Sequence, residues 1–307
     1  MIMYTEQPLN YSEIAPYVSE DISCIATALE QQQKLFFYDA CALRKHAALS
    51  RPEPLLSFFL QSSCVVVITR GILMELASNS QTLQPGCISY IRTLHDAGIS
   101  VSIIYEEDIF SLLDNCFSSS LQINTFLFLA VTTTKLATGA IEKALNATPA
   151  LNQNLLVNLT ADRNLFRLFF SSVRQSKEPD DNLGEELLTV CVHLLANLPS
   201  CREYQFIILT EDKGALFLIN KASNNSCKHL EQRYFSAITT PRLAQRLYSI
   251  GLLNSEQVLT LLSSDFQGET IRILGSGPYH LTPQHMTFSP AELAQQITTP
   301  DALHIHY

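Results

Sequence analysis

Two short apolar runs that each lead into acidic residues constrain the fold of this chain more than any other feature. The first covers residues 35–38 and is followed by Asp39, and the second covers residues 206–209 and is followed by Thr210 and, two residues later, Asp212. Such runs, bounded by polar residues, are typical of strands buried on both faces of a parallel sheet. Because open α/β sheets bind ligands at the carboxyl ends of their strands, both aspartates are expected at one shared site.

Other apolar runs alternate with segments of helical periodicity, which is the pattern of an α/β protein. Three further strands are predicted at residues 64–68, 99–105 and 234–239. Helices are predicted at residues 11–33, 72–76, 85–97, 183–195, 214–219, 241–253 and 255–262, and most of residues 109–175 are also expected to be helical. The predicted fold is a three-layer α/β/α arrangement with a central parallel sheet of about five strands.

The chain is expected to have three parts. Residues 1–33 are predicted to be an N-terminal helical extension, residues 34–262 the main domain, and residues 263–307 a small α+β extension with a strand at 270–274 and a helix at 289–297. Within the main domain, residues 108–178 are predicted to be a long helical insertion.

Composition excludes several classes of protein. Of the 307 residues, 47% are hydrophobic and 16% charged, which is typical of a packed globular protein. The net charge of −9 argues against a broad, non-specific nucleic-acid binder, although it leaves room for a local basic patch. The eight cysteines include no C-x-x-C pair, so we expect reduced thiols rather than a zinc site.

Neither a membrane-spanning segment nor a secretory signal is evident. The apolar runs are interrupted well before about 20 residues, the length that a membrane helix needs. The first residues lack a basic region followed by an apolar core. We therefore expect a cytoplasmic protein without a membrane association.

Four acidic positions are expected to meet at the carboxyl edge of the sheet. Asp39 and Asp212 follow strands, Glu75 lies in the helix after the second strand, and Glu185 lies near the start of the helix before the fourth strand. Ionised carboxylates that share a dry cleft repel one another and need a cation to coexist. Hard oxygen ligands favour Mg²⁺ or Mn²⁺, and such ions promote phosphodiester hydrolysis.

Several neighbouring residues are candidates for supporting roles. Asp181 or Glu186 is an alternative to Glu185 as the third carboxylate, and Asp180 and Asp181 also suit helix capping. The Thr210 hydroxyl is placed to bond a metal-bound water or to orient a carboxylate. The nearest basic residues for a substrate phosphate are Arg44, Lys45, Arg70 and Lys213.

Four segments follow one another in an informative order. They are Tyr38-Asp-Ala-Cys-Ala-Leu43, Thr69-Arg-Gly-Ile-Leu-Met-Glu-Leu76, Gly184-Glu185 and Thr210-Glu-Asp-Lys-Gly-Ala215. Together they resemble PIN-domain ribonucleases over about residues 34–262.

The resemblance implies a metal-dependent endoribonuclease acting on RNA, with Asp39, Glu75, Glu185 and Asp212 as both the catalytic and the metal-binding quartet. Because this family includes toxins of toxin–antitoxin pairs, it also implies a toxin or defence role and a protein partner, either an antitoxin or a complex subunit. A homo-oligomer is a further expectation.

Three alternatives were weighed against this interpretation. A non-catalytic scaffold of the same fold would bind a partner protein through the helical insertion or the C-terminal tail. A phosphotransfer enzyme with an aspartyl intermediate fits less well, because Cys41 rather than a second aspartate lies two residues after Asp39. A serine hydrolase is disfavoured because the chain lacks a G-x-S-x-G motif.

Overall fold

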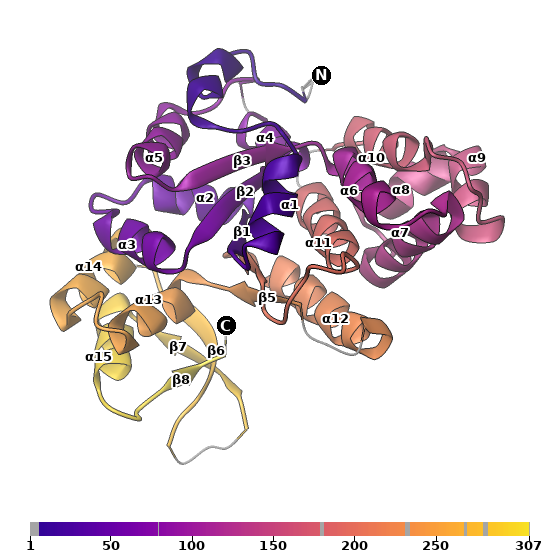
Figure 1. Cartoon of the computed structure of the whole chain (residues 1–307). Coiled ribbons are helices and arrows are strands. Elements are labelled where there is room, and N and C mark those ends of the chain that lie inside the picture. The colour runs from indigo at the N-terminus through magenta and orange to yellow at the C-terminus, as the bar shows by residue number, and fades with distance from the viewer. Residues whose placement is uncertain are drawn as a thin grey trace.

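A five-stranded parallel sheet forms the centre of the molecule in the computed structural model, which describes residues 6–78, 80–178, 181–230, 234–266, 269–278 and 282–306 (Figure 1). The strands are β1 (Lys34–Tyr38), β2 (Cys64–Thr69), β3 (Ser100–Ile104), β4 (Phe206–Leu209) and β5 (Phe235–Ile238), in the order β3-β2-β1-β4-β5. The predicted fold class is therefore confirmed. Asp180, one of the predicted helix caps, lies outside the described residues.

The strand order reverses between β1 and β4. From β1 the chain moves through β2 to β3 on one side, then returns to place β4 and β5 on the other side. Phe37 of β1 pairs with Val67 of β2 and with Ile208 of β4. In open α/β sheets this reversal leaves a crevice at the carboxyl ends of the two strands, where ligands bind.

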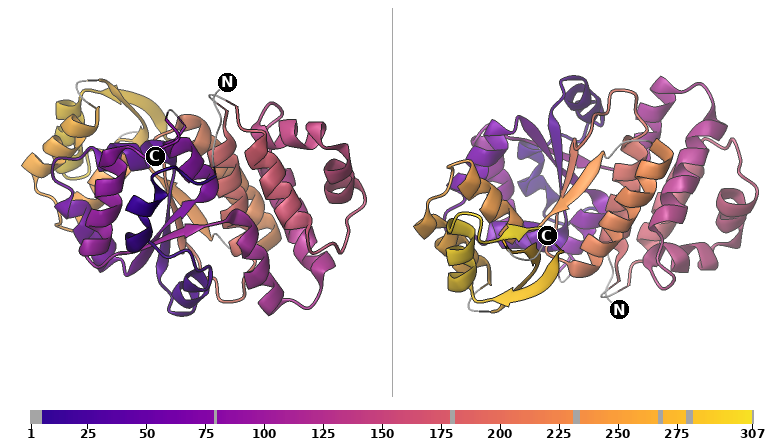
Figure 2. Two further views of the ribbon diagram at one scale, coloured as in Figure 1. Left: turned by 90° about the horizontal axis from the view of Figure 1, so that it is seen from above. Right: turned by 90° about the horizontal axis from the view of Figure 1, so that it is seen from below.

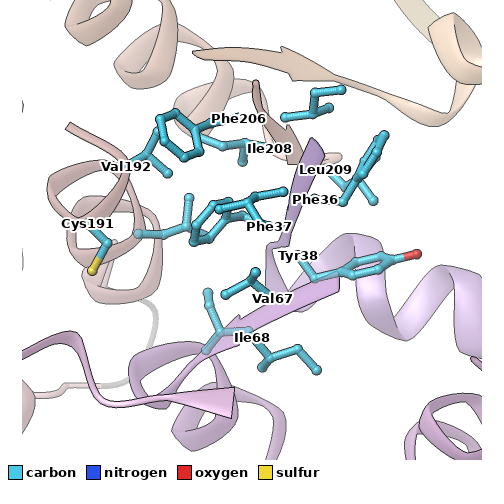
Figure 3. Close-up of a cluster of buried hydrophobic side chains, with 14 of the residues drawn as sticks. Phe36, Phe37, Tyr38, Val67, Ile68, Cys191, Val192, Phe206, Ile208 and Leu209 are labelled. Atoms are coloured by element: carbon cyan, nitrogen blue, oxygen red, sulfur yellow. The ribbon is translucent and has the colours of Figure 1, made fainter. Parts of the chain in front are cut away.

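Helices cover both faces of the sheet. One face carries α2 (Ala40–Ala47), α3 (Glu53–Gln61) and α5 (Pro85–Asp96), and the other carries α1 (Ser23–Glu30), α11 (Leu183–Leu195) and α12 (Lys213–Leu230) (Figures 1 and 2). On the first face, the Phe36 ring lies 5.1 Å from that of Phe59. On the second, Phe37 points toward Cys191 and Val192 of α11 (Figure 3). Because successive side chains of a strand point to opposite faces, β1 contributes apolar side chains to the core on both faces of the sheet.

A lobe of helices lies between β3 and β4 in the chain, as the sequence predicts. It consists of η3 (Glu106–Asp108), α6 (Ile109–Cys116), α7 (Ser120–Thr134), α8 (Ala140–Ala147), α9 (Pro149–Asn152), the π-helical turn η4 (Gln153–Val157) and α10 (Leu165–Gln175). Helix α7 packs against both α11 and α12, so α11 is enclosed between the sheet and this lobe. We refer to these elements as the helical lobe.

Helix α4 (Arg70–Leu76) begins at the end of β2.

The C-terminal part follows β5. Its elements are α13 (Thr240–Ser249), α14 (Ser255–Phe266), β6 (Ile271–Ser276), β7 (Gln284–Phe288), α15 (Pro290–Thr298) and β8 (His304–Ile305). The three strands form an antiparallel sheet in the order β7-β6-β8. Helix α15 begins at Ser289 in a capping box with Glu292, which explains its predicted start.

The structure differs from the predicted helices in several places, including α13, which ends at Ser249 and not at residue 253. Residues 11–22 are not a continuous helix but contain the 3₁₀ turns η1 (Tyr11–Glu13) and η2 (Ala15–Tyr17), and the helix begins only at Ser23. Pro16 explains the difference, because proline lacks an N–H and disfavours helical geometry in the residue before it. Helix α3 was not expected, and α12 extends well beyond residue 219.

Arg174 attaches α10 to η3, the segment that directly follows β3. Its guanidinium is 1% exposed and donates to Glu106 at 2.5 Å, to both carboxylate oxygens of Glu107 at 2.7 Å and to Glu6 at 3.0 Å. Glu106 in turn accepts from the Gly71 N–H at 2.7 Å. The acidic residues of η3 are therefore an anchor for α10.

We expect Arg174→Met to lower the free energy of unfolding by about 3–5 kcal/mol, because it leaves buried carboxylates without their cation. Urea denaturation measures this change. Arg167→Met, at an exposed position of the same helix, is the matched control and should change stability by less than about 0.5 kcal/mol. Similar effects of the two substitutions would contradict the anchoring role.

Candidate metal centre

Asp39 and Thr210 meet where the strand order reverses. Asp39 is 2% exposed, and its Oδ2 accepts hydrogen bonds from the Cys41 thiol at 2.6 Å and from the Thr210 hydroxyl at 2.8 Å. Burial raises the pKa of the Cys41 thiol, so it stays protonated and donates. The Thr210 oxygen also accepts from the Asp212 N–H at 3.1 Å. Thr210 therefore links the segment after β1 to the segment after β4.

Asp212 lies at the start of α12 and is exposed. Its Oδ1 accepts from the Ala215 N–H at 2.8 Å, so this carboxylate bonds the first turn of α12. Asp212 also acts electrostatically on Asp39, whose pKa is raised by burial and, to a smaller extent, by the Asp212 charge. The two aspartates that follow β1 and β4 thus lie within electrostatic reach of each other.

Glu75 enters the site from α4. Its Oε1 accepts from the Lys177 ammonium at 2.9 Å and from the Gly184 N–H at 3.1 Å. A Cβ atom at Gly184 would lie only 2.6 Å from Glu75 Oε2, so a larger residue at this position would displace the Glu75 side chain. Burial is the main cause that raises the pKa of Glu75, and Asp39 adds to it.

Glu185 lies within electrostatic reach of the other three predicted carboxylates. Its Oε2 is buried and accepts no hydrogen bond from the described residues. Burial, followed by the negative charges of Glu75, Asp39 and Asp212, raises the pKa of Glu185 to about 9. The negative charges of the three other predicted carboxylates thus all act on Glu185, and we refer to these four residues as the acidic cluster.

The two alternatives to Glu185 have other partners. Glu186 points into the helical lobe, where it accepts from the Leu136 N–H at 2.8 Å and the Ile141 N–H at 2.9 Å. Asp181 accepts from the Leu183 N–H at 3.2 Å at the start of α11 and pairs with Lys177. Glu186 thus faces away from the cluster, and Asp181 accepts from the first N–H of α11, whose N-cap residue is Asn182.

Lys177 is a site residue that the sequence pattern does not single out. It follows α10, its side chain is 6% exposed, and it bridges Glu75 and Asp181. The one signal in the sequence is the four-residue spacing from Lys177 to Asp181, which is common in helices and loops alike. In this arrangement Glu75 is paired with a lysine.

Carboxylate oxygens are the ligands that the hard cations Mg²⁺ and Mn²⁺ prefer. Among the described residues, Glu185 Oε2 is a buried acceptor without a hydrogen-bond partner. Within the residues that the structure describes, no group of three or more His, Cys, Asp or Glu side chains lies in a position to hold a metal ion. Glu75 instead directs one oxygen to Lys177, and Asp39 directs one to Cys41 and Thr210.

The four predicted phosphate-binding residues lie in different surroundings. Lys213 is exposed beside Asp212, Lys45 lies 3.8 Å from a Glu211 carboxylate oxygen, and Arg44 donates to the backbone carbonyl of Glu75. Arg70 is buried, bonded to Glu20 at 2.8 Å and covered by the rings of Tyr11 and Tyr105. Arg70 therefore holds the N-terminal segment.

Comparison with known proteins finds no family model, no curated protein and no solved structure that matches this chain. Among the described residues, no helix is both long enough and apolar enough to cross a membrane.

The raised pKa of Glu185 predicts a pH-dependent stability. In the unfolded chain this carboxyl ionises near 4.5, whereas the folded chain retains the proton to about 9. Its contribution to stability is therefore fully present below pH 4.5 and is lost as the pH rises toward about 9. Asp39, Glu75 and Asp212 oppose its ionisation, and Lys177 is the nearby cation.

We expect the free energy of unfolding of the wild type, measured by urea denaturation in EDTA, to fall between about pH 5 and 9. The fall should be smaller in Glu185→Gln, which cannot ionise. Glu13→Gln, at an exposed position, is the control and should follow the wild type. Parallel curves for wild type and Glu185→Gln would contradict the assignment.

Proposed function

We propose that this chain is a metal-dependent endoribonuclease that hydrolyses RNA phosphodiester bonds with Mg²⁺ or Mn²⁺. The observation that carries the proposal is Glu185. Its Oε2 atom is buried and has no hydrogen-bond partner among the described residues, and the charges of three further carboxylates act on it. Several buried acids at one point are costly to ionise, and a divalent cation is the partner that would offset the cost. The cluster lies at the strand reversal where open α/β sheets bind ligands.

Each residue has a role in this proposal. Asp39, Glu75, Glu185 and Asp212 hold the cation, which when bound supplies an activated water and polarises a phosphoryl oxygen. Thr210 and Cys41 fix the orientation of Asp39 through their hydrogen bonds. Lys213 is exposed beside Asp212, which suits contact with a substrate phosphate.

The biological setting rests on the resemblance to PIN-domain ribonucleases. That resemblance supplies RNA as the substrate, a toxin or defence role, and an antitoxin or complex subunit as a protein partner. A cytoplasmic location and a homo-oligomer belong to the same proposal.

Cleavage of single-stranded and structured RNAs tests the proposal. We expect the wild type to cleave RNA with Mn²⁺ or Mg²⁺ and not with EDTA. The Asp212→Asn substitution should lower the cleavage rate at least about 100-fold, because a neutral amide binds the metal ion more weakly than a carboxylate does. Glu186→Gln is the matched control, since Glu186 faces the helical lobe. Cleavage that persists in EDTA or in Asp212→Asn would refute the proposal.

A specific observation favours a second candidate, a non-catalytic scaffold. Lys177 is buried and already supplies a positive charge to Glu75. In a scaffold, this lysine would be the permanent counter-ion of the cluster, and the helical lobe or the C-terminal extension would bind a partner protein.

Metal-dependent stability separates the two candidates. For the nuclease, Mn²⁺ at about 100 times its Kd should raise the free energy of unfolding by ~2.7 kcal/mol in the wild type. Lys177→Met should be about 3–5 kcal/mol less stable in EDTA, because Glu75 and Asp181 lose their cation, and Mn²⁺ should recover part of the loss. For the scaffold, Mn²⁺ should change neither protein. Lys143→Met, at an exposed lysine, is the control and should cost less than about 1 kcal/mol.

A further inference from the structure

A groove of about 720 Å³ lies next to the segment that carries Asp212. Glu211 and Lys213, the neighbours of Asp212 in the chain, line one end of it. The groove continues between the first turns of α12, the start of α13 and the strands β6 and β7 of the C-terminal extension. Its volume is in the range of about 300–1,000 Å³ that ligand clefts occupy.

The groove gathers positive charge on a chain whose net charge is −9. Lys45, Lys213 and Arg272 line it, and Lys213 and Arg272 are exposed. Two carboxylates also line it, Glu211 and Glu269. Glu211 lies 3.8 Å from the Lys45 ammonium and accepts from a backbone N–H at 2.5 Å, so its charge is engaged within the protein. Lys213 and Arg272 are thus the exposed cations in the lining of the groove, and Glu269 is its exposed carboxylate.

Two phenylalanine rings lie among these cations. Phe217 is 68% exposed and follows Lys213 by one helical turn on α12, so both lie on the same face of that helix. Phe266, at the end of α14, lies 4.1 Å below the Lys45 ammonium. A largely exposed phenyl ring gains little from folding, whereas it offers a stacking surface to a planar ligand.

We propose that this groove binds the single-stranded RNA segment adjoining the scissile phosphate, and this inference rests on the proposed function. Phe217 stacks on an unpaired base, and Lys213 and Arg272 contact the phosphates on either side of it. Cationic grooves with interleaved aromatic rings are the chemistry by which proteins bind single-stranded nucleic acid. A base must leave its duplex before a ring can stack on it, which favours a single strand over a paired one.

The proposal gives the C-terminal extension a role. Arg272 comes from β6, and the neighbouring strand β7 contributes His285 to the same groove. The extension is held against α13 through Gln245, which donates to the Leu303 carbonyl at 2.6 Å and accepts from the Ile305 N–H at 2.9 Å. These bonds fix the far wall of the groove relative to the sheet that carries Asp212.

Fluorescence anisotropy with a short, labelled oligouridine tests the groove in EDTA, where binding is measured without cleavage. We expect Phe217→Ala to bind roughly 5- to 150-fold more weakly, the range for the loss of one stacked base. Arg272→Gln should lower the slope of log K against log salt by about 0.7, the value for one phosphate contact on a single strand. Both positions are exposed, so thermal unfolding should match the wild type.

Two matched controls lie elsewhere on the surface. Tyr204→Ala removes an exposed aromatic ring at the amino end of β4, and Arg167→Gln removes an exposed cation on α10. Both should bind the oligouridine like the wild type.

The outcomes separate this proposal from the nuclease. If the wild type does not bind the oligouridine, or if the groove and control variants bind alike, the groove proposal is overturned, even where RNA cleavage is observed. Weaker binding confined to the groove variants supports it, even if no RNA is cleaved with Mn²⁺, in which case the nuclease proposal alone fails.

Discussion

The burial of α11 is the constraint on which the rest of the structure depends. Every one of its residues except Glu185 is buried. A helix that is apolar on nearly all sides must be covered all round, and the sheet, α4, α12 and the helical lobe provide that cover. The lobe is thus part of the core of the molecule. Because α11 is fixed on every side, its first turn holds Glu185 over the carboxyl ends of β1 and β4.

One lysine offsets part of the negative charge of the acidic cluster. Lys177, in the segment that follows α10, pairs with Glu75. Helix α10 also carries Arg174 in its last turn, and Arg174 binds the carboxylates that follow β3. Helix α10 therefore both binds the segment after β3 and leads to the lysine at the site. A displacement of α10 would disturb both ion pairs together.

The elements that were predicted well are those whose signal is local. Strands β1 and β4 and helix α11 lie within a residue of their predicted bounds, because each is a dense apolar run bounded by polar residues or caps. The errors fall where tertiary contacts override the pattern. Residues 11–22 carry helical spacing, yet Ser19 bonds the backbone of β3 instead. The length of α12 is likewise set by its packing on α11 and β5.

The sequence by itself determined the parallel sheet and the order of four acidic residues along the chain, since each depends on neighbours within a few positions. Only the tertiary structure shows that Glu186 points into the helical lobe, whereas Glu185 lies near the other predicted carboxylates. Adjacent helical residues point about 100° apart, so their roles depend on which side of α11 the helical lobe covers. The positions of Lys177, Arg70 and the groove residues are likewise tertiary, because their partners lie on elements remote in the chain. Local pattern carries no information about such contacts.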